Sequence, residues 1–398
     1  MKSEWKTKTV GELTSYIAKG IPPKYAEVKN NATIYVLNQK CNRDYVISYE
    51  QARLHDISIK AVPNDKMLRF GDIVINSTGT GTAGRIAQFT ENNIPTTVDG
   101  HMIIMRPTKE IDYLYYGYAL KAYQSKIESL AEGSTGQTEI NKQRLQDEIS
   151  ICYPEDILLQ HSIAETLLFL DNKIELNNKI NENLEMQAQA IFKSWFVDFE
   201  PFGGVMPDDW RIGTISEICG YSKDKVDIDD LTLDTYYSTE NMRPNRQGAV
   251  QATTLPTIKQ ITACKKGDVL ISNIRPYFKK ILYCFSDCGC STDVLCFVPN
   301  KAEYSAFLYC TLYADKFFDY MIAGSKGTKM PRGDKQQIMM YPICIPSTDY
   351  IQKFNQAVAP MLETVYTNRV EANNLANLRD TLLPKLMNGE IDVSKVKI

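Results

Sequence analysis

Two stretches of the chain carry apolar residues at alternating steps of four and three. The first stripe contains Ile163, Leu167, Leu170, Ile174, Asn177, Asn181, Leu184, Ala188, Ile191 and Trp195. The second contains Phe354, Val358, Met361, Val365, Asn368, Ala372, Leu375, Leu378 and Leu382. This heptad pattern is typical of an α-helical coiled coil. The central asparagines should weaken the pairing and fix its register and partner.

Each stripe predicts a long helix that pairs with the other one. A helix of about 40 residues is about 60 Å long, which exceeds the width of a small domain. An antiparallel pair would place the domains that precede the helices at opposite ends. Pro360 and Pro384 should kink or end the second helix locally. An aromatic group near the end of the first helix predicts a core or partner contact: Phe192, Trp195 and Phe196.

The segments that precede the stripes predict β-rich domains. Their short apolar runs, bounded by turn residues, include Asp72–Asn76, Met102–Arg106, Val269–Ser272 and Val294–Val298. Helical stretches are expected at Tyr113–Leu130 and Tyr304–Tyr320. The predicted fold class is α+β, with similar domains at 1–156 and 201–350 and long helical regions at 157–200 and 351–398.

These domains are two copies of one pattern. Trp5 returns as Trp210, Tyr35 as Tyr236, and the run from Phe70 to Asn76 as the run from Lys266 to Ser272. The offset between copies shrinks along the chain, as short deletions in loops would produce. A repeat of half the chain length indicates two similar domains. The segment Thr97–Asp99 matches Ser291–Asp293, which would place His101 opposite Val294 or Leu295.

Charge and composition limit the function without defining it. The chain is 43% hydrophobic and 23% charged, which is ordinary for a globular protein. No apolar run reaches the roughly 18 residues of a membrane span, and the N-terminus lacks a signal-peptide core, so no membrane contact and a cytoplasmic location are expected. The β-rich segments each have balanced charges, whereas residues 157–200 carry 3 basic and 7 acidic side chains.

This balance restricts how the chain could bind nucleic acid. DNA-binding domains are usually more basic. Basic groups would have to gather on one face, or partner chains would have to supply much of the attraction to phosphate.

The ten cysteines contain no CxxC pair, although Cys284, Cys288, Cys290 and Cys296 lie close together. Zinc sites favour paired cysteines with Cys or His partners. The three histidines lie in the other half of the chain: His55, His101 and His161. Buried or reduced thiols are therefore favoured over metal binding.

Several motifs resemble catalytic sequences without their context. The run Gly79–Gly84 has the spacing GxGxxG, but Arg85–Phe89 predicts a strand where a dinucleotide site requires a helix. A hairpin turn is therefore favoured. Pro207–Asp209 lacks the lysine of a nuclease motif, and Ile21–Lys24 lacks the flanking residues of adenine methyltransferases. Without a recognisable nucleophile–base pair, the sequence predicts a binding protein that has no catalysis or cofactor of its own.

The loops between repeated strands are rich in side chains suited to base edges and phosphates. The first copy offers Asn38, Gln39, Lys40, Arg43, Asn76, Thr78, Thr80, Thr82, Arg85, Ser134, Thr135, Gln137 and Lys142. The second offers Thr239, Asn241, Arg243, Arg246, Asn273, Arg275, Lys279, Lys280, Ser325, Lys326, Thr328, Lys329 and Arg332. Any one of them could be an ordinary solvated residue. As a set at corresponding places, they predict DNA contacts that differ between the copies.

Over essentially its whole length the chain resembles the specificity (S) subunit of type I restriction–modification enzymes. The resemblance rests on the order of domains and helices and on three segments: 170–177 (LDNKIELN), 190–199 (AIFKSWFVDF) and 378–391 (LRDTLLPKLMNGEI). The helical segments are fairly specific, whereas either β-rich domain alone would be a weak match.

The resemblance implies two target recognition domains, each reading half of an interrupted site in the major groove of double-stranded DNA. The helices would set the spacer and dock two methyltransferase (M) subunits, which bind S-adenosylmethionine and methylate adenine. Restriction/translocase (R) subunits would join for restriction in phage defence. Two alternatives stay open: a coiled-coil scaffold that binds only proteins, and a methyltransferase or nucleotide-dependent enzyme in its own right.

Overall fold

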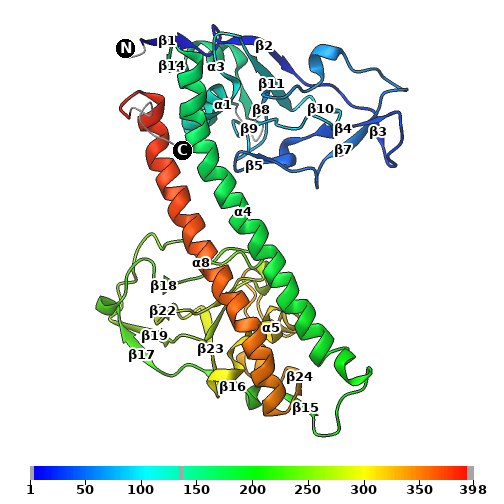
Figure 1. Ribbon diagram of the computed structural model, residues 1–398, viewed down its shortest axis with the longest axis vertical. Helices are drawn as coiled ribbons and strands as arrows, with labels where there is room; N and C mark the ends of the chain where they lie inside the picture. The colour runs from blue at the N-terminus through cyan, green and yellow to red at the C-terminus, as the bar shows by residue number, and fades with distance from the viewer. Residues whose placement is uncertain (1–3, 134–137, 392–398) are drawn as a thin grey trace. The chain divides into compact units, whose positions relative to one another are not determined.

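The computed structural model describes residues 4–133 and 138–391, which belong to two compact units (Figure 1). Unit 1 comprises residues 1–172 together with 376–398. Unit 2 comprises residues 173–375. Each unit contains one of the two sequence copies, together with part of each long helix.

Unit 1 contains two four-stranded sheets within its described residues. The first is antiparallel, with the order β2 (Thr14–Lys19), β11 (Met102–Pro107), β8 (Ile73–Asn76), β9 (Ile86–Gln88). The second has the order β10 (Thr96–Val98), β4 (Thr33–Leu37), β7 (Arg53–Asp56), β3 (Tyr25–Ala26), with β10 and β4 parallel. The remaining strands form pairs: β1 (Trp5–Thr9) with β14 (Ser150–Pro154), β5 (Asn42–Arg43) with β6 (Val46–Ile47), and β12 (Ala131–Glu132) with β13 (Glu139–Ile140).

Unit 2 also contains two four-stranded sheets within its described residues, of which the first keeps the strand order of its counterpart in unit 1 and the second does not. Their orders are β16 (Cys219–Tyr221), β23 (Val294–Pro299), β20 (Val269–Ser272), β21 (Ile281–Tyr283), and β17 (Lys225–Asp227), β19 (Gln260–Cys264), β22 (Cys288–Cys290), β18 (Tyr236–Tyr237). β22 and β18 are parallel, as β10 and β4 are in unit 1. The difference is that β18 lies at the edge in unit 2, where β22 pairs with β19, whereas β10 lies at the edge in unit 1, where β4 pairs with β7. β15 (Arg211–Thr214) pairs with β24 (Pro342–Ile345), as β1 does with β14. These repeated sheets, with the helices below, confirm the predicted fold class.

The short helices are more divided than the sequence suggests. Unit 1 contains α1 (Tyr113–Ala122), α2 (Gln124–Ser129) and α3 (Lys142–Asp147). Unit 2 contains α5 (Ser305–Tyr313), α6 (Asp315–Ala323) and α7 (Lys335–Met339). The single helices expected from Tyr113 and from Tyr304 are therefore each interrupted, at Tyr123 and Ala314, where the backbone leaves helical geometry.

The central strands are buried on both faces. Ile73 and Ile75 of β8 pack into the core that contains α1, whereas Val74 faces a second core lined by strands of both sheets. In unit 2, Val269 and Leu270 of β20 divide in the same way between two cores. Side chains alternate between the faces of a strand, so an uninterrupted apolar run marks a strand covered on both sides.

The strand register corrects one sequence match. Ser77 donates its N–H to the carbonyl oxygen of His101, and Asn273 donates in the same way to Asp293, both at 2.8 Å. The equivalent of His101 is therefore Asp293, and its expected pairing with Val294 or Leu295 is wrong. Sequence matching had shifted this segment by two residues because small polar turn residues there resemble one another.

The two long helices are α4 (Ile157–Phe196) and α8 (Thr348–Met387), each with 40 residues. In unit 1, Arg379 of α8 donates to Asp171 of α4 at 2.6 Å. In unit 2, Asn368 donates to Asn181 at 3.0 Å, and the ring centroid of Phe196 lies 5.1 Å from that of Phe354. In these pairs the residue number on α4 rises while that on α8 falls. The helices are therefore antiparallel, as predicted.

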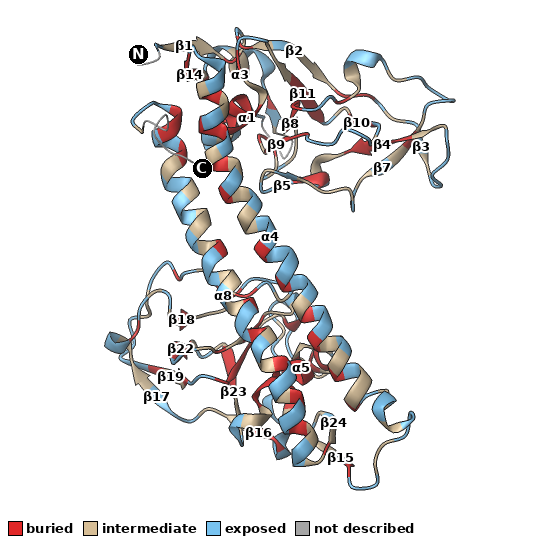
Figure 2. Ribbon diagram, in the orientation of Figure 1, coloured by how far each residue is buried: buried red, intermediate tan, exposed pale blue. Residues whose placement is uncertain are grey.

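Burial along the helices follows the predicted stripes with one correction (Figure 2). Every stripe position of α4 is buried or half-buried, including Asn177 and Asn181. On α8, however, Leu378 is 47% exposed. Arg379 takes the inward position next to it because its guanidinium pairs with the Asp171 carboxylate. Burial resumes one residue later than expected, at Leu383 and Leu386.

Of the two outcomes expected at Pro360 and Pro384, a kink or an end of the helix, the end does not occur. The helix continues through both positions to Met387. Both prolines lie on the exposed side, as do Gln356 and Asp380 four residues earlier. The carbonyl groups that lose a helical N–H partner can therefore bond to water.

A largely buried ion pair joins the helices of unit 2. Arg369 of α8 donates to Glu185 of α4 at 2.8 Å and to the carbonyl oxygen of Arg246 at 2.9 Å. The Tyr313 hydroxyl donates to the second oxygen of Glu185 at 3.2 Å. Burial raises the pKa of the Glu185 carboxyl, and the Arg369 charge opposes that rise.

Arg369→Ala should destabilise the full chain by about 3–5 kcal/mol, because it leaves a buried carboxylate without its cation. Stability linked to a carboxyl with a raised pKa is present at low pH and lost as pH rises through that pKa. The loss should therefore be larger at neutral pH than under acidic conditions, as measured by denaturant unfolding. Arg332→Ala is the control, because its pair with Asp293 is about half exposed and should contribute less than about 1 kcal/mol. Equal losses for both variants would contradict the buried-pair account.

Candidate nucleic-acid interface

In unit 1, backbone hydrogen bonds bring several of the predicted contact loops together. We call residues 38–40, 77–82, 99–101 and 138–140 loop cluster 1. Gly79 donates its N–H to the Thr138 carbonyl at 3.2 Å, and Ile140 donates to Ser77 at 2.7 Å. The Gln39 amide donates to the Thr78 hydroxyl at 2.6 Å, and that hydroxyl lies 3.0 Å from Nδ1 of His101.

Unit 2 contains the same framework with different side chains. We call residues 238–241, 272–280, 291–293 and 326–333 loop cluster 2. Arg275 donates its N–H to the Pro331 carbonyl at 2.8 Å, and Gly333 donates to Asn273 at 3.2 Å. These bonds correspond to those from Gly79 and Ile140 in unit 1. The duplication therefore preserves the backbone support of the loops while their side chains differ.

Three of the predicted contact residues are buried and support the loops. Asn76 donates to the Gln39 carbonyl at 3.1 Å. Asn241 accepts from the backbone N–H of Ser238 at 2.7 Å and donates to Tyr236 at 2.8 Å. Asn273 is 7% exposed. The amides of Asn76 and Asn241 therefore hold the loop backbone, whereas the Asn273 Oδ1 is buried without a hydrogen-bond partner among the described residues. Contacts of these three residues with DNA stay a prediction.

Other predicted residues are exposed or half-buried. The exposed ones are Lys40, Arg43, Thr80, Lys142, Arg243, Lys326, Thr328, Lys329 and Arg332. The half-buried ones are Asn38, Gln39, Thr78, Thr82, Arg85, Thr239, Arg246, Arg275, Lys279, Lys280 and Ser325. Arg43 lies in the β5–β6 hairpin and Lys142 opens α3, outside the loop clusters. Ser134, Thr135 and Gln137 lie outside the described residues.

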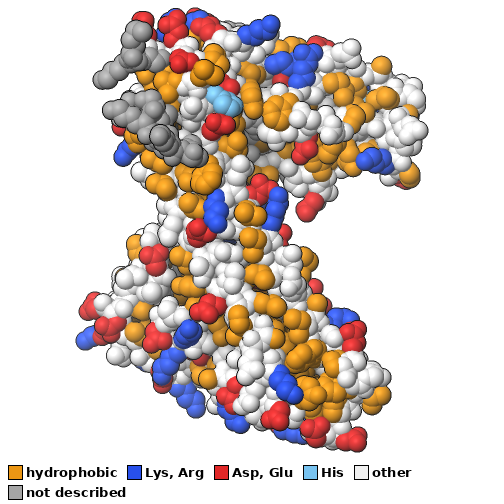
Figure 3. Space-filling model, in the orientation of Figure 1, with side chains coloured by type: hydrophobic (Ala, Val, Ile, Leu, Met, Phe, Trp, Pro, Cys, Tyr) orange, Lys and Arg blue, Asp and Glu red, His pale blue; other side chains and the backbone are white. Residues whose placement is uncertain are grey.

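Several cations of unit 2 already have partners. Arg246 and Lys279 both donate to the Asp315 carboxylate at 2.6 Å, and these hydrogen bonds hold the pKa of Asp315 at about 2. Lys280 donates to the Thr239 carbonyl at 2.6 Å, and burial lowers the pKa of its ammonium group. Basic and acidic side chains are interspersed on the face shown in Figure 3. This mixture agrees with the balanced charge of the domains.

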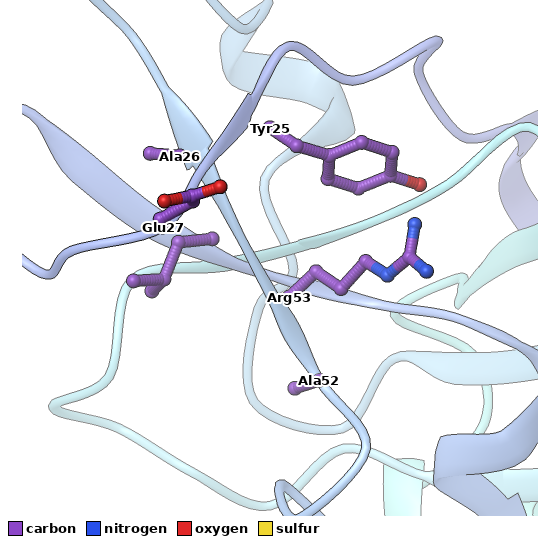
Figure 4. Close-up of a pocket in the computed structure, with 6 residues that line it drawn as sticks. Tyr25, Ala26, Glu27, Ala52 and Arg53 are labelled. Carbon is purple, nitrogen blue, oxygen red and sulfur yellow. The ribbon is translucent and has the colours of Figure 1, made fainter.

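A hollow of about 680 Å³ lies against loop cluster 2. Its lining includes Thr239, Arg275 and Lys280 and also the polar segment 250–256, which sequence reasoning missed. The signal in that segment is its polar run Gln251-Ala252-Thr253-Thr254. A smaller pocket of about 370 Å³ lies between β3 and β7 of unit 1, where Arg53 stacks on Tyr25 at 4.6 Å (Figure 4). None of the predicted contact residues lines it.

The glycine-rich run forms the predicted hairpin turn. Gly79, Gly81 and Gly84 have positive φ angles and join the antiparallel strands β8 and β9. No helix opens at this turn, so the geometry of a dinucleotide site is absent from it. The turn instead presents Thr78, Thr80 and Thr82 within loop cluster 1.

The clustered cysteines lie in one small core of unit 2. Cys284, Cys288, Cys290 and Cys296 are all buried among apolar side chains, together with Cys264. The sulfurs of Cys284 and Cys288 lie 3.7 Å apart. Within residues 4–133 and 138–391, no group of three or more His, Cys, Asp or Glu side chains is arranged to hold a metal ion. In the same part of the chain, no helix has the length and apolar character to cross a membrane.

Comparisons with known proteins identify the duplication. The family model for the type I restriction modification DNA specificity domain matches residues 2–186 and again residues 207–378. The MjaIX specificity subunit of a type I restriction enzyme from Methanocaldococcus jannaschii is 25% identical, with 99% of this chain and 95% of that protein aligned. The HindI specificity subunit from Haemophilus influenzae is 22% identical, with 98% and 100% aligned.

A solved structure shares the fold. The S subunit of a type I restriction–modification system from M. genitalium superimposes with a TM-score of 0.63 and 19% identity over 97% of this chain and 96% of that chain. The duplicated fold and the two matched regions define a protein with two DNA specificity domains. The chain belongs to the family of type I restriction–modification specificity subunits, as its sequence resemblance indicated.

Two glycines of the hairpin provide a test of how closely it packs against α2. A Cβ at Gly84 would lie 2.6 Å from the Glu128 Cα, whereas a Cβ at Gly81 would meet nothing within 4 Å. Both have positive φ, so Gly81→Ala should cost about 1–2 kcal/mol from backbone strain alone. Gly84→Ala should cost clearly more, because the collision with backbone adds to the strain. Denaturant unfolding of both variants measures the difference, and similar losses would refute it.

Proposed function

We propose that this chain is the DNA-reading subunit of a type I complex and has no catalysis of its own. Residues 1–156 and 201–350 act as target recognition domains, each reading half of an interrupted site in the major groove. The observation that carries this proposal is the repeated loop framework. The two clusters share backbone bonds, such as those from Gly79 and Arg275, and offer different side chains to the bases.

Side chains in the two domains divide into base and phosphate contacts. The exposed cations Lys40, Arg43, Lys142, Arg243 and Lys329 suit phosphate, because long flexible side chains fix position without reading sequence. Half-buried residues on the clusters suit base edges, since their orientation is held by neighbours.

We propose that two M subunits dock on the helices. Exposed apolar side chains on α4 support this: Leu158 is 76% exposed, Phe169 58%, Leu176 51% and Met186 66%. The M subunits would bind S-adenosylmethionine and methylate adenines, and R subunits would join for restriction. Partner chains around the DNA would also supply attraction to phosphate that the balanced recognition domains lack.

The direct test is a methylation map of the chain co-expressed with its methyltransferase partner in a host free of adenine methylation. A two-part methylated motif is the expected result. Methyl transfer by the purified chain alone would show an enzyme. A complex that forms without yielding any two-part motif would show a protein scaffold.

The helices are proposed to set the spacer between the half-sites. Removing one heptad from each helix, residues 174–180 and 370–376, keeps their pairing register and shortens each by about 10 Å. The preferred spacer should shorten by about three base pairs, at about 3.4 Å per pair. Glu175→Ala/Lys179→Ala is the control, since it removes an exposed ion pair without changing length. An unchanged spacer in the shortened variant would rule out this role for the helices.

Exchange of residues 1–156 for the corresponding domain of another specificity subunit should alter one half-site only. The reason is that each loop cluster is built entirely within its own copy of the domain. The methylation map of the chimera measures the outcome. A change in both half-sites would contradict independent reading.

A further inference from the structure

The loop Asn273–Lys280 of unit 2 holds one arginine in an unusual conformation. It replaces the glycine turn of unit 1 with a short 3₁₀ turn, Pro276–Phe278. The residues on either side of this turn, Arg275 and Lys279, have φ of 50° and 49°. Non-glycine residues rarely adopt this left-handed region, and such strain gathers at functional loops.

The backbone around Arg275 is fixed from both directions. Its N–H donates to the Pro331 carbonyl, and the preceding residue, Ile274, forms a β-bridge with Arg332. Pro276 restricts the backbone on the other side because its ring fixes φ. The root of the Arg275 side chain is therefore held rigidly, as a residue that selects between similar ligands requires.

The Arg275 side chain has no partner for its charge among the residues that the structure describes. Its Nε is buried and makes no hydrogen bond. The neighbouring cations do have partners: Lys279 pairs with Asp315, and Lys280 donates to the Thr239 carbonyl. The terminal guanidinium nitrogens are not among the buried atoms and belong to a side chain that lines the hollow, so a ligand there that supplies acceptors would give the charge its partner.

The surroundings of Arg275 favour a base edge over a phosphate. Arg275 lines the hollow of about 680 Å³ together with Glu240 and Asp293. Lys280 lines the hollow as well, so two cations are balanced by two carboxylates and no excess positive charge favours a phosphate group. The major-groove edge of guanine is uncharged and presents two acceptors, O6 and N7, which match the fork of arginine donors. Its paired cytosine adds an amino donor that a carboxylate can accept.

We propose that Arg275 reads a guanine in the half-site recognised by residues 201–350. Its guanidinium donates to O6 and N7, and it acts as a specificity-determining residue. The equivalent position in unit 1 is Gly79, which has no side chain, so this contact belongs to one half-site only. The inference rests on the proposed function and names the base that this part of the interface selects.

The experiment maps adenine methylation by the full chain with its methyltransferase partner, in the wild type and in three variants. Exchange of residues 1–156 in a parallel sample identifies which half-site belongs to residues 201–350. Arg275→Ala and Arg275→Lys should relax one guanine position in that half-site, raising methylation of sites with another base there roughly 10- to 100-fold relative to the guanine site. Arg275→Lys retains the charge and loses the fork.

Arg243→Ala is the matched control, because Arg243 is an exposed arginine of the same domain that lies outside loop cluster 2. It should reduce methylation at all sites alike and leave the motif unchanged. A half-site without guanine, or Arg275 variants that weaken every site equally, would overturn the inference. If Arg275→Ala fails to fold, the motif of Arg275→Lys decides. A wild-type complex without a two-part motif would instead overturn the proposed function itself.

Discussion

The burial of the apolar faces of α4 and α8 is the constraint on which the rest of the structure depends. These faces do not form a separate rod beside the domains. Ile163 and Leu167 enter the main core of unit 1, and Ala188 and Phe354 enter that of unit 2. The same apolar stripes therefore join the helices to each other and complete both β-rich domains. Changing the helix faces changes the domains as well.

The duplication separates what supports the loops from what the loops present. The backbone bonds of Gly79 and Arg275 are equivalent, although one residue has no side chain and the other carries a guanidinium. The side chains at these positions can therefore diverge while the fold is kept. Both residues have a positive φ angle. Glycine adopts such an angle freely, whereas in arginine it strains the backbone, and the surrounding structure must hold it in place.

The sequence alone predicted the helices, because their buried residues recur at a fixed spacing. It did not predict which way an individual side chain points. The heptads gave both helices and their pairing, and two repeated domains followed from the repeated motifs. Asn76 and Asn241 were predicted as contacts, but residue type does not tell whether an amide faces solvent or a neighbouring carbonyl. Leu378 fits the heptad and is nonetheless exposed, because the ion pair of Arg379 takes the inward position. The helix α8 continues past both prolines, because the exposed carbonyls that lose a helical partner can be hydrated.

Unit 1 is assembled from both ends of the chain, whereas unit 2 is one continuous segment. Leu386 and Met387 belong to the core of unit 1, and the Tyr115 hydroxyl donates to the Met387 carbonyl at 3.3 Å. During synthesis, the domain that begins first must therefore wait for the last turns of α8 before its core closes. The described core residues of unit 2 all precede those turns, so the core of unit 2 can close before that of unit 1.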